Sequence, residues 1–385
     1  MTVKVAWVST WNVKCGIASH LSHLLETVPA DDLVICAARS SATLRPDESN
    51  CLRNWGSGKD SNGLMQVASD LHALSVRAIV IEFNYGFFNH GELDDFIRTV
   101  TLRGASVIMH LHSTVDPLPE RNWQLSGFLE GLKQCKRILV HTPLDMNRLK
   151  AVGLIDNVKL MPHGVVKRAR ATRKPATHGR EPLVASFGFS FENKGLIQLV
   201  EAVSILRDKG EKVRLRMLNA EHPDPKTRSR DVVQSVRESI DRYSLRDAVE
   251  LRSDFLEDEL CLELLSDADL VVNPYQSSGE SASGSVRYGL TAGRPVAVTP
   301  LSIFDDLGEA VFRLPGISPR DLAEGIASAL QQIRADTASA QRIRDTASRW
   351  LDAHDITQQG ARLMRLSQTL SAESSGLQSS RTVAL

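Results

Sequence analysis

Long hydrophobic runs are missing from this chain of 385 residues. No apolar stretch approaches the roughly 18 residues that a membrane-spanning helix needs, so we expect no transmembrane segment. The first apolar run, residues 3–8, is shorter than the core of a signal peptide and is typical of a buried strand. The sequence therefore favours a globular protein, which we expect in the cytoplasm.

Paired cysteines and a strong charge bias are missing too. The five cysteines form no CxxC pair and no Cys/His spacing typical of a zinc site, so we expect reduced thiols. The formal net charge is zero, which argues against a nucleic-acid partner. Residues 1–182 nevertheless carry a small basic excess. Peripheral contact of the first half with an anionic membrane surface is therefore an alternative to a chance imbalance.

Two common nucleotide-binding signatures are absent as well. The loop after the first apolar run, residues 9–18, contains Gly16 but no GxGxxG pattern, and the chain has no GK[ST] phosphate loop. Both absences count against a nicotinamide-dependent enzyme and a P-loop NTPase. Gly16 has two interpretations: it lets a phosphate or a sugar approach a helix N-terminus, or it serves only the turn.

Short apolar strands alternate with amphipathic stretches along the chain, as is typical of parallel sheets with helices on both faces. A chain of this length is better divided between two cores than built around one, so we expect two α/β domains in series. We predict strands over residues 4–8, 32–37, 78–82, 106–111, 137–140 and 158–161, and over residues 183–187, 212–218, 248–251, 270–272 and 295–298.

A break in this alternation sets the expected domain boundary. Residues 166–182 have almost no apolar periodicity and many charges, so we expect an exposed linker whose basic residues are solvated, with membrane contact as the alternative. The expected divisions are a first domain over residues 1–165, a linker over 166–182, a second domain over 183–350, a C-terminal helix over 351–370 that packs back on the first domain, and a disordered tail over 371–385.

The stretch from Ala268 to Pro300 is the most informative. It passes from an apolar strand at residues 270–272 through a small polar loop into helix-compatible sequence near Ala282. The first amides of a helix have no internal partners, and with the helix dipole they form a site for an anion, phosphate above all. Glu280 stands at the mouth of this site, where it either caps the helix or contacts a phosphorylated ligand.

Two other loops at the carboxyl ends of predicted strands carry polar residues, where open parallel sheets bind ligands. Lys194 lies just before a predicted helix and is well placed to neutralise a phosphate. His110 and His112 face the same side of their strand. No third ligand or carboxylate signature accompanies them, so we expect no metal there, and we expect a histidine at this strand tip to hydrogen-bond a substrate hydroxyl.

Taken in order, these features resemble the retaining family-4 glycosyltransferases of the GT-B fold. The resemblance covers most of residues 1–350. It rests on Cys15-Gly16-Ile17-Ala18, on His112, on PHGV at 162–165, on Gly188 with Lys194-Gly195, and on ADLVVNPY, GES and AGRPV in the stretch after residue 267. It implies an α/β protein with two Rossmann-like domains facing each other across a cleft, and no cofactor besides the donor substrate.

The resemblance also implies a role for individual residues. Glu280 contacts the donor sugar at its reacting end, and His112 holds a sugar hydroxyl, so both are expected to be catalytic. The residues expected to bind the donor diphosphate are Gly16, Lys194, Ser283, Gly284 and Ser285. No metal is expected to hold the diphosphate.

Two positions depart from the family pattern. The second acid of the family motif, which usually holds the ribose, falls on Tyr288, and the usual arginine after Gly188 falls on Phe189. Tyr288 can still hydrogen-bond a ribose through its phenol. We expect Arg287 to replace part of the missing charge, so both residues are included among the donor-binding residues.

The expected activity is a metal-independent hexosyltransferase that uses GDP-mannose or a UDP-hexose and a glycan or lipid-linked acceptor, in surface polysaccharide or lipopolysaccharide biosynthesis. The first alternative is a nucleotide-sugar epimerase of the same fold. The second is a catalytically silent protein that binds a nucleotide or a sugar.

Overall fold

The chain forms two compact units. The computed structural model describes residues 4–40, 42–58, 62–117, 124–167 and 180–382. Unit 1 comprises Met1–Gly164, Gly279–Ala282 and Ile356–Leu385, and unit 2 comprises Val165–Ser278 and Ser283–Asp355. The short segment Gly279–Ala282 therefore belongs to unit 1, although its neighbours in sequence belong to unit 2.

Unit 1 contains a parallel sheet of seven strands in the order β3-β2-β1-β4-β5-β6-β7. Its edge strand β3 was not predicted, because Arg53 and Asn54 interrupt the apolar pattern there. The other six strands lie where the sequence predicts them. The bounds are β1 (Val5–Ser9), β2 (Leu33–Ala38), β3 (Cys51–Trp55), β4 (Ala78–Phe83), β5 (Ser106–Leu111), β6 (Arg137–Val140) and β7 (Val158–Leu160).

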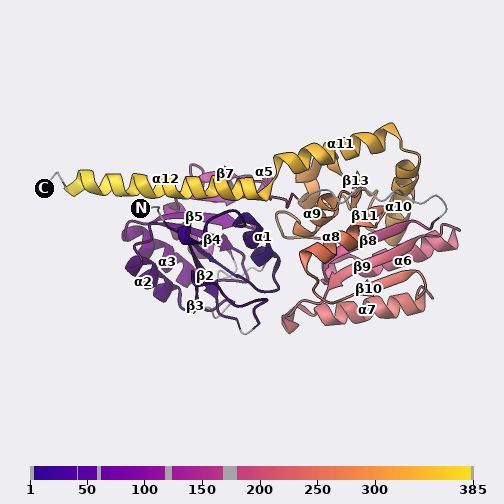
Figure 1. Cartoon of the computed structure of the whole chain (residues 1–385), viewed down its shortest axis with the longest axis horizontal. Helices are drawn as coiled ribbons and strands as arrows, with labels where there is room; N and C mark the ends of the chain where they lie inside the picture. Colours follow the sequence, from indigo (N-terminus) through magenta and orange to yellow (C-terminus); the bar gives the residue numbers. More distant parts are fainter. Residues whose placement is uncertain (1–3, 41, 59–61, 118–123, 168–179, 383–385) are drawn as a thin grey trace. The chain divides into compact units, whose positions relative to one another are not determined.

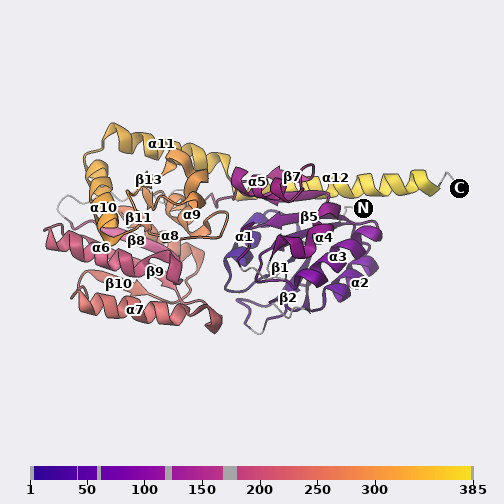
Figure 2. The same cartoon turned by 180° about the vertical axis from the view of Figure 1, so that it is seen from behind.

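Helices cover both faces of this sheet. In Figures 1 and 2, α2 and α3 lie on one side of the sheet and α12 runs along the other. α12 packs against α1, β1, β4 and β5. The bounds are α1 (Gly16–Leu24), α2 (Leu64–Ala73), α3 (His90–Leu102), α4 (Leu129–Gln134), α5 (Pro143–Ala151) and α12 (Ile356–Thr382).

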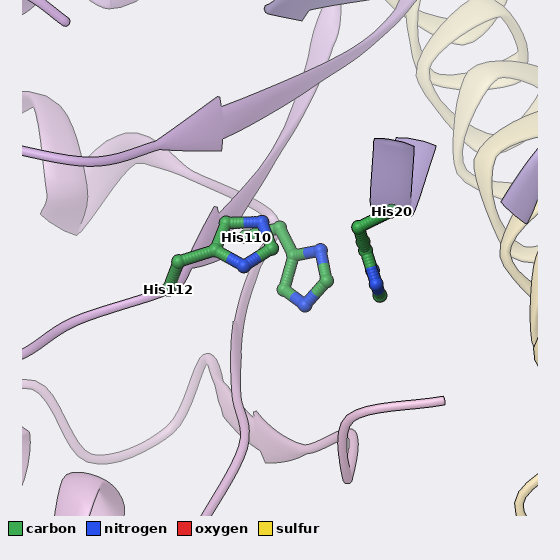
Figure 3. Close-up of side chains that lie close together, drawn as sticks. All are labelled: His20, His110 and His112. Carbon is green, nitrogen blue, oxygen red and sulfur yellow. The ribbon is translucent and has the colours of Figure 1, made fainter. Parts of the chain in front are cut away.

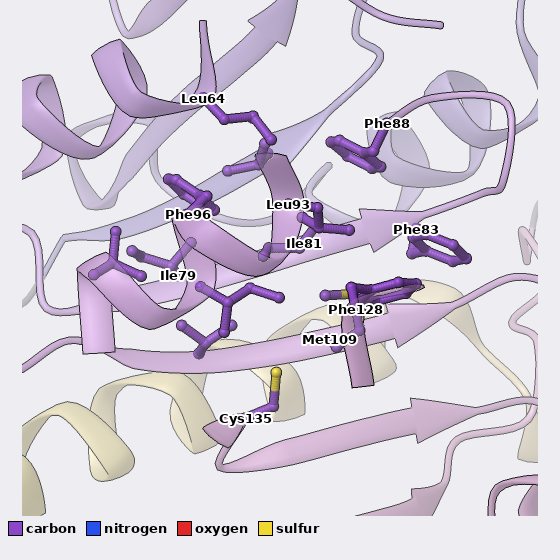
Figure 4. Packing of buried hydrophobic residues seen from close by; sticks show 14 of the residues in the cluster. Leu64, Ile79, Ile81, Phe83, Phe88, Leu93, Phe96, Met109, Phe128 and Cys135 are labelled. Carbon is purple, nitrogen blue, oxygen red and sulfur yellow. The ribbon is translucent and has the colours of Figure 1, made fainter. Parts of the chain in front are cut away.

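The two faces of the unit 1 sheet differ in chemistry. Ile79, Ile81 and Phe83 of β4 point into an apolar core that Phe96 and other residues of α3 fill from the opposite side (Figure 4). The residues between them on β4 point to the other face, because side chains alternate along a strand. That face carries the buried Glu82.

Unit 2 contains a parallel sheet of six strands in the order β10-β9-β8-β11-β12-β13. β13 has two residues, too few to give a strand pattern, and it was not predicted. The bounds are β8 (Leu183–Phe189), β9 (Arg214–Ala220), β10 (Val249–Arg252), β11 (Leu270–Asn273), β12 (Val296–Val298) and β13 (Phe312–Arg313). Two parallel-sheet units confirm the predicted α/β fold class with two Rossmann-like domains.

Unit 2 has an apolar core on each side of its sheet. One core lies under α6, α7 and α10, and the other lies under α8 and α9 and reaches Trp350 of α11. The bounds are α6 (Leu196–Asp208), α7 (Ser229–Arg242), α8 (Asp258–Ser266), α9 (Gly284–Thr291), α10 (Pro319–Arg334) and α11 (Ala338–Ala353).

The C-terminal helix α12 packs closely against α1 within unit 1. A Cβ atom at Gly360 of α12 would lie 1.8 Å from the carbonyl oxygen of Leu24, so only glycine fits this contact. The helix continues to Thr382, whereas the sequence predicts disorder from residue 371. Among the residues that the structure describes, no helix has both the length and the apolar character needed to cross a membrane.

The predicted linker is described only in part, because residues 168–179 lie outside the described residues. Lys167, one of its basic residues, pairs with Asp352 at 2.8 Å on the surface of unit 2. Its neighbour Val166 accepts a hydrogen bond from the Thr291 hydroxyl. The beginning of the linker is therefore held against unit 2.

Candidate functional site

Polar side chains gather in unit 1 where three adjacent strands end. Glu82 of β4 and His110 of β5 are register partners, and His141 directly follows β6. Alternation directs these side chains to the face that α1 and α12 cover. All three residues are buried, and so is His20 on α1. A group of ionisable side chains therefore occupies the space between the sheet and α1.

Glu82 lies at the centre of this group. Its carboxylate accepts a hydrogen bond from His112 Nε2 at 2.7 Å and one from Trp7 Nε1 at 3.3 Å, and His110 Nδ1 lies 2.9 Å from it. Burial alone would raise the pKa of Glu82. The adjacent His110 and His112 outweigh burial and hold that pKa well below the usual carboxyl range. Glu82 is therefore an ionised carboxylate in a buried setting.

The histidine side chains stand close together around Glu82. Figure 3 shows His20 on α1 facing His110 and His112 on β5 and the residue after it. The ring centroids of His110 and His112 are 4.7 Å apart, and those of His20 and His112 are 5.3 Å apart. Burial lowers the pKa of His112, and it lowers the pKa of His20 and His141 well below 6.5.

This cluster corrects one premise of the sequence analysis. Absence of a metal was expected because no third ligand and no carboxylate accompanied His110 and His112. The structure supplies both, as His20 and Glu82. His20 lies far away in the sequence, so spacing gave no sign of it. Glu82 is the one charged residue of the predicted strand 78–82, and a lone charge in a buried strand is the signal that could have indicated it.

The segment that carries Glu280 is fastened to unit 1 on both sides of that residue. The Ser113 hydroxyl donates to the carbonyl of Gly279 at 2.7 Å. The amide of Ser281 donates to the carbonyl of His112 at 3.3 Å, and its hydroxyl donates to Asp145 at 2.8 Å. Glu280 itself is exposed between these anchors. The two residues expected to be catalytic, Glu280 and His112, are thus brought together.

Asp145 is a buried anchor that the sequence analysis missed. It forms a capping box with Thr142 at the start of α5, and it also accepts a hydrogen bond from the Thr114 hydroxyl at 2.5 Å. The capping box can be read from the sequence TPLD at 142–145, but the hydrogen bond from Ser281 to Asp145 depends on tertiary contacts. The anchor for the Glu280 segment is therefore built from a helix cap.

Gly16 begins α1 and is exposed. Its φ is not positive, and a Cβ atom there would meet nothing within 4 Å. The preceding Cys15 makes no side-chain cap. The turn therefore does not require glycine, and the approach of a ligand to Gly16 stays a prediction.

The loop after β8 in unit 2 is shaped by close backbone contacts. Gly195 has a φ of 69°, and a Cβ atom there would lie 1.9 Å from the carbonyl oxygen of Pro274. Gly188 also has a positive φ, and its missing Cβ faces Ser285. Lys194 sits between these glycines with its Nζ 3.8 Å above the centroid of the Tyr275 ring, a cation–π contact.

Tyr275 joins Lys194 to the first turn of α9. Its hydroxyl lies 3.0 Å from the Ser283 hydroxyl and 2.6 Å from the Ser285 hydroxyl. Ser283 is also the N-cap of α9, because its side chain accepts from the amide of Val286. Both hydroxyls are therefore occupied within the protein, and a ligand would meet the backbone amides at the exposed Gly284 instead.

Arg287 is not directed toward this surface. Its guanidinium is buried, forms an ion pair with Asp306, and donates to the carbonyl of Ser283. Burial lowers its pKa, and Asp306 opposes that shift. Contrary to the expectation that it replaces a missing charge at the donor, Arg287 supports the first turn of α9 from within the core.

The two positions that depart from the family pattern lie among aromatic side chains. The Tyr288 ring is 4.3 Å from that of Phe187, and its hydroxyl donates to Asp258 at 2.7 Å. Asp258, on α8, thus places a carboxylate beside the position of the missing acid, which no local pattern revealed. Phe189 stands in a group of half-buried rings with Phe191, His222 and Phe255.

No family model matches the sequence, and no curated protein is significantly similar to it. Solved structures do match. HepE from Anabaena, solved with UDP and glucose, is 14% identical with a TM-score of 0.71, over 94% of this chain and 99% of that one. A UDP-forming α,α-trehalose-phosphate synthase from Burkholderia vietnamiensis is 13% identical with a TM-score of 0.72, over 97% and 99%.

A sucrose-phosphate synthase from Thermosynechococcus elongatus is 16% identical with a TM-score of 0.71, over 96% of this chain and 100% of that one. At such identities the similarity establishes the fold alone. It extends over nearly the whole length of each chain, so both units take part in it.

Proposed function

We propose that this chain, built on the GT-B fold that it shares with those structures, is a retaining glycosyltransferase that moves a hexose from a nucleoside diphosphate sugar. The observation that carries the proposal is the first turn of α9. There, Gly284 is exposed, Tyr275 connects the serines on either side of it to Lys194, and Glu280 stands three residues before Ser283. An anion site and a carboxylate are thus joined within a few residues of chain.

The chemistry of transfer needs these two features together. Breaking the bond between the anomeric carbon and the diphosphate develops negative charge on the leaving phosphate and positive charge on the sugar ring. The α9 amides and Lys194 would stabilise the phosphate, and the Glu280 carboxylate would orient the sugar. Because the helix N-terminus and the ammonium supply the charge, we propose that the diphosphate binds without a metal ion.

Within unit 1, we propose that His112 and Gly16 contact the donor. Both ring nitrogens of His112 have protein partners, Glu82 and His141, so holding a sugar hydroxyl requires one of them to be exchanged. Gly16 leaves open space at the start of α1 for a phosphate oxygen. Tyr288 would hydrogen-bond the ribose as an acceptor, since its hydroxyl proton is given to Asp258.

The proposed donor is a UDP-hexose, with GDP-mannose as the alternative. UDP is named for HepE and for the trehalose-phosphate synthases among the similar structures. The proposed acceptor is a glycan or a lipid-linked glycan in surface polysaccharide or lipopolysaccharide biosynthesis. We place the protein in the cytoplasm, with peripheral membrane contact through the basic first half.

Replacing Glu280 tests the enzyme proposal. Glu280→Ala should abolish sugar transfer and leave nucleotide binding nearly intact, because the diphosphate contacts lie on α9 and Lys194. The matched control is Glu324→Ala, which removes an exposed glutamate of α10. Equal turnover in wild type and Glu280→Ala, or no turnover in wild type with a panel of donors and acceptors, would sink the proposal.

Thermal stabilisation by GDP, UDP, ADP and dTDP tests the anion site separately. A nucleotide at 100 times its dissociation constant should add about 2.7 kcal/mol to the free energy of unfolding. We expect UDP to act on the wild type and to fail on Lys194→Ala. Stabilisation without any transfer would favour the silent binding protein, and interconversion of nucleotide sugars without an acceptor would favour the epimerase.

A further inference from the structure

The histidine cluster of unit 1 contains buried nitrogen atoms that no protein group satisfies. Neither ring nitrogen of His20 has a hydrogen-bond partner, and neither has Nε2 of His110. Both residues are at least nine-tenths buried. A buried polar atom without a partner costs about 1–3 kcal/mol, so the fold bears this cost unless something else binds there.

The hydrogen bonds of His112 and His141 also favour a bound cation. His112 Nε2 donates to Glu82, and His141 Nδ1 donates to the carbonyl of Met161 at 3.0 Å. In neutral imidazoles the remaining nitrogens, His112 Nδ1 and His141 Nε2, each present a lone pair. These two atoms are 3.3 Å apart. Two lone pairs at this distance require a proton or a metal cation near both.

Glu82 occupies the position of a carboxylate that supports metal-binding histidines from outside the ligand set. Histidines that bind a metal commonly give their other N–H to a carboxylate, which fixes the ring and strengthens its lone pair. Glu82 takes the N–H of His112 and lies 2.9 Å from Nδ1 of His110, although at an angle too poor for a hydrogen bond. A small rotation of the His110 ring would align that bond.

We propose that His20, His110 and His112 bind a divalent transition metal ion, with His141 beside them as a fourth ligand. One nitrogen of each of the first three lies within 4.8 Å of the others. Neutral imidazoles favour zinc, copper, nickel and iron over magnesium and calcium, which prefer oxygen. Zinc fits four nitrogen ligands in a tetrahedron and needs no change of oxidation state.

The separations of the ring nitrogens can be compared with those of a tetrahedral site. With bonds of about 2.1 Å, nitrogen ligands of a tetrahedral zinc lie about 3.4 Å apart. His112 and His141 already match this separation at 3.3 Å. One nitrogen each of His20, His110 and His112 lies within 4.8 Å of the others, so these three must approach further, and His20 can do so without breaking a hydrogen bond. The His20 and His141 ring centroids are 6.4 Å apart, so binding by all four also requires these two rings to approach.

Such an ion would connect parts of unit 1 that are distant in sequence. His20 lies on α1, whose first residue is Gly16, and His110 lies on the central strand β5. A metal would fasten α1 to the sheet one turn below the exposed Gly16. This site goes beyond the proposed transferase chemistry, in which no metal acts at the diphosphate. With Nε2 on Glu82 and Nδ1 on a metal, His112 has no ring nitrogen left for a sugar hydroxyl, so the metal site replaces the role proposed for His112 above and leaves those of Glu280 and Lys194 unchanged.

Zinc binding to the full-length protein tests the proposal without any donor or acceptor. The protein, freed of any histidine tag and of metal, is dialysed against Zn²⁺, and bound zinc is measured by elemental analysis. We expect one equivalent in the wild type and loss of affinity by at least about 100-fold in His20→Gln, because loss of an outer partner alone costs about 10- to 100-fold. Glu82→Gln should show that smaller loss.

The matched control is His72→Gln, which removes an exposed histidine of α2 and should bind zinc like the wild type. His20→Gln breaks no hydrogen bond, so its circular dichroism and urea unfolding without metal should match those of the wild type. Co²⁺ provides a second readout through the visible absorption of a tetrahedral nitrogen site. Absence of zinc binding in the wild type, or equal binding in His20→Gln, would overturn the proposal whatever the outcome of the transfer assays.

Discussion

The two units place opposite chemistry at the carboxyl ends of similar parallel sheets. In unit 1, β4, β5 and β6 end in buried ionisable groups, among them Glu82, His110 and His141. In unit 2, the loop after β8 carries aromatic rings and Lys194, and the loop after β11 leads to the amides at the start of α9. The first is a buried network of a carboxylate and imidazoles, and the second is an exposed helix N-terminus for which we propose anion binding.

The difference shows that the architecture sets where ligand groups lie, while single residues set what they bind. Alternation along the strand buries Glu82 under α1, where it needs positive or metal partners. The helix N-terminus of α9 needs only an approaching anion, because its amides are already aligned. The predictions below test this contrast, from the largest expected effect to the smallest.

Removing Asp306 should have the largest effect on the free energy of unfolding, because Asp306 pairs with the buried guanidinium of Arg287 in unit 2. Asp306→Ala leaves the guanidinium of Arg287 buried without its carboxylate. Such a loss costs about 3–5 kcal/mol. Urea unfolding should show it, and the double variant Arg287→Met/Asp306→Leu should regain most of the stability. A cost below about 1 kcal/mol would return Arg287 to the list of donor-binding candidates.

Alanine substitutions at Gly195 and Gly16 compare a glycine that the fold requires with one that has open space around it, where we propose that a ligand binds. Gly195→Ala in unit 2 forces a Cβ into the carbonyl of Pro274 at a positive φ and should cost about 3 kcal/mol. Gly16→Ala in unit 1 meets open space, so its stability should stay within about 0.5 kcal/mol of the wild type. Urea midpoints of the two variants measure both effects.

The nucleotide assay then completes the glycine comparison. Gly16→Ala should weaken stabilisation by UDP while its own stability is unchanged, since the new methyl group occupies the space proposed for a phosphate oxygen. Unchanged UDP stabilisation would remove Gly16 from the proposed site. A stable Gly195→Ala variant would show that the loop around Lys194 is more adaptable than the contact with Pro274 indicates.

Most of the fold was predictable because its central strands are predominantly apolar. Eleven predicted strands appear at or near their predicted places, and the two missed ones, β3 and β13, lie at sheet edges where apolar patterning is weakest. The C-terminal residues from 371 were expected to be disordered because they lack a core pattern. The structure assigns them to α12 as far as Thr382.

The candidate site was predictable where one loop carries it and not where distant segments meet. Ser283 and Gly284 follow directly from the strand, loop and helix pattern. The partners of Ser281 and His112, which are Asp145 and Glu82, come from other elements. The direction of Arg287 depends on Asp306, which only packing brings near. Local sequence therefore predicts the polar turn at the start of α9 but not the anchors of Glu280, and anion binding at that turn stays a prediction.

Loosening the anchor of Glu280 should have a moderate effect on catalysis. Ser281→Ala removes the hydrogen bond to Asp145, worth about 1 kcal/mol, so we expect kcat to fall about fivefold with UDP binding unchanged. Ser277→Ala, in the same loop but exposed, is the matched control. If both variants turn over like the wild type, the anchor does not position Glu280.

The smallest effect concerns the pH dependence of stability and compares a buried histidine of unit 1 with a half-buried histidine of unit 2, both outside the histidine cluster. Burial lowers the pKa of His90 in unit 1 and of His222 in unit 2, with Asp116 and Asp224 opposing these shifts. In the unfolded chain each imidazole titrates near 6.5. As pH falls below that value, the unfolded state gains a proton that the folded state refuses, so the free energy of unfolding decreases.

Phenylalanine at either position removes this contribution. His90→Phe loses the hydrogen bond from Nδ1 to Gln124 and should be less stable than the wild type at pH 7.5, but the gap should narrow as pH falls toward 5. His222 is half-buried, so the difference in stability between His222→Phe and the wild type should change less with pH than that for His90→Phe. Urea unfolding across this pH range measures both gaps. If the difference in free energy of unfolding between the wild type and His90→Phe widened as pH falls, the folded state would stabilise protonated His90. His90 would then behave like a charged group of unit 1.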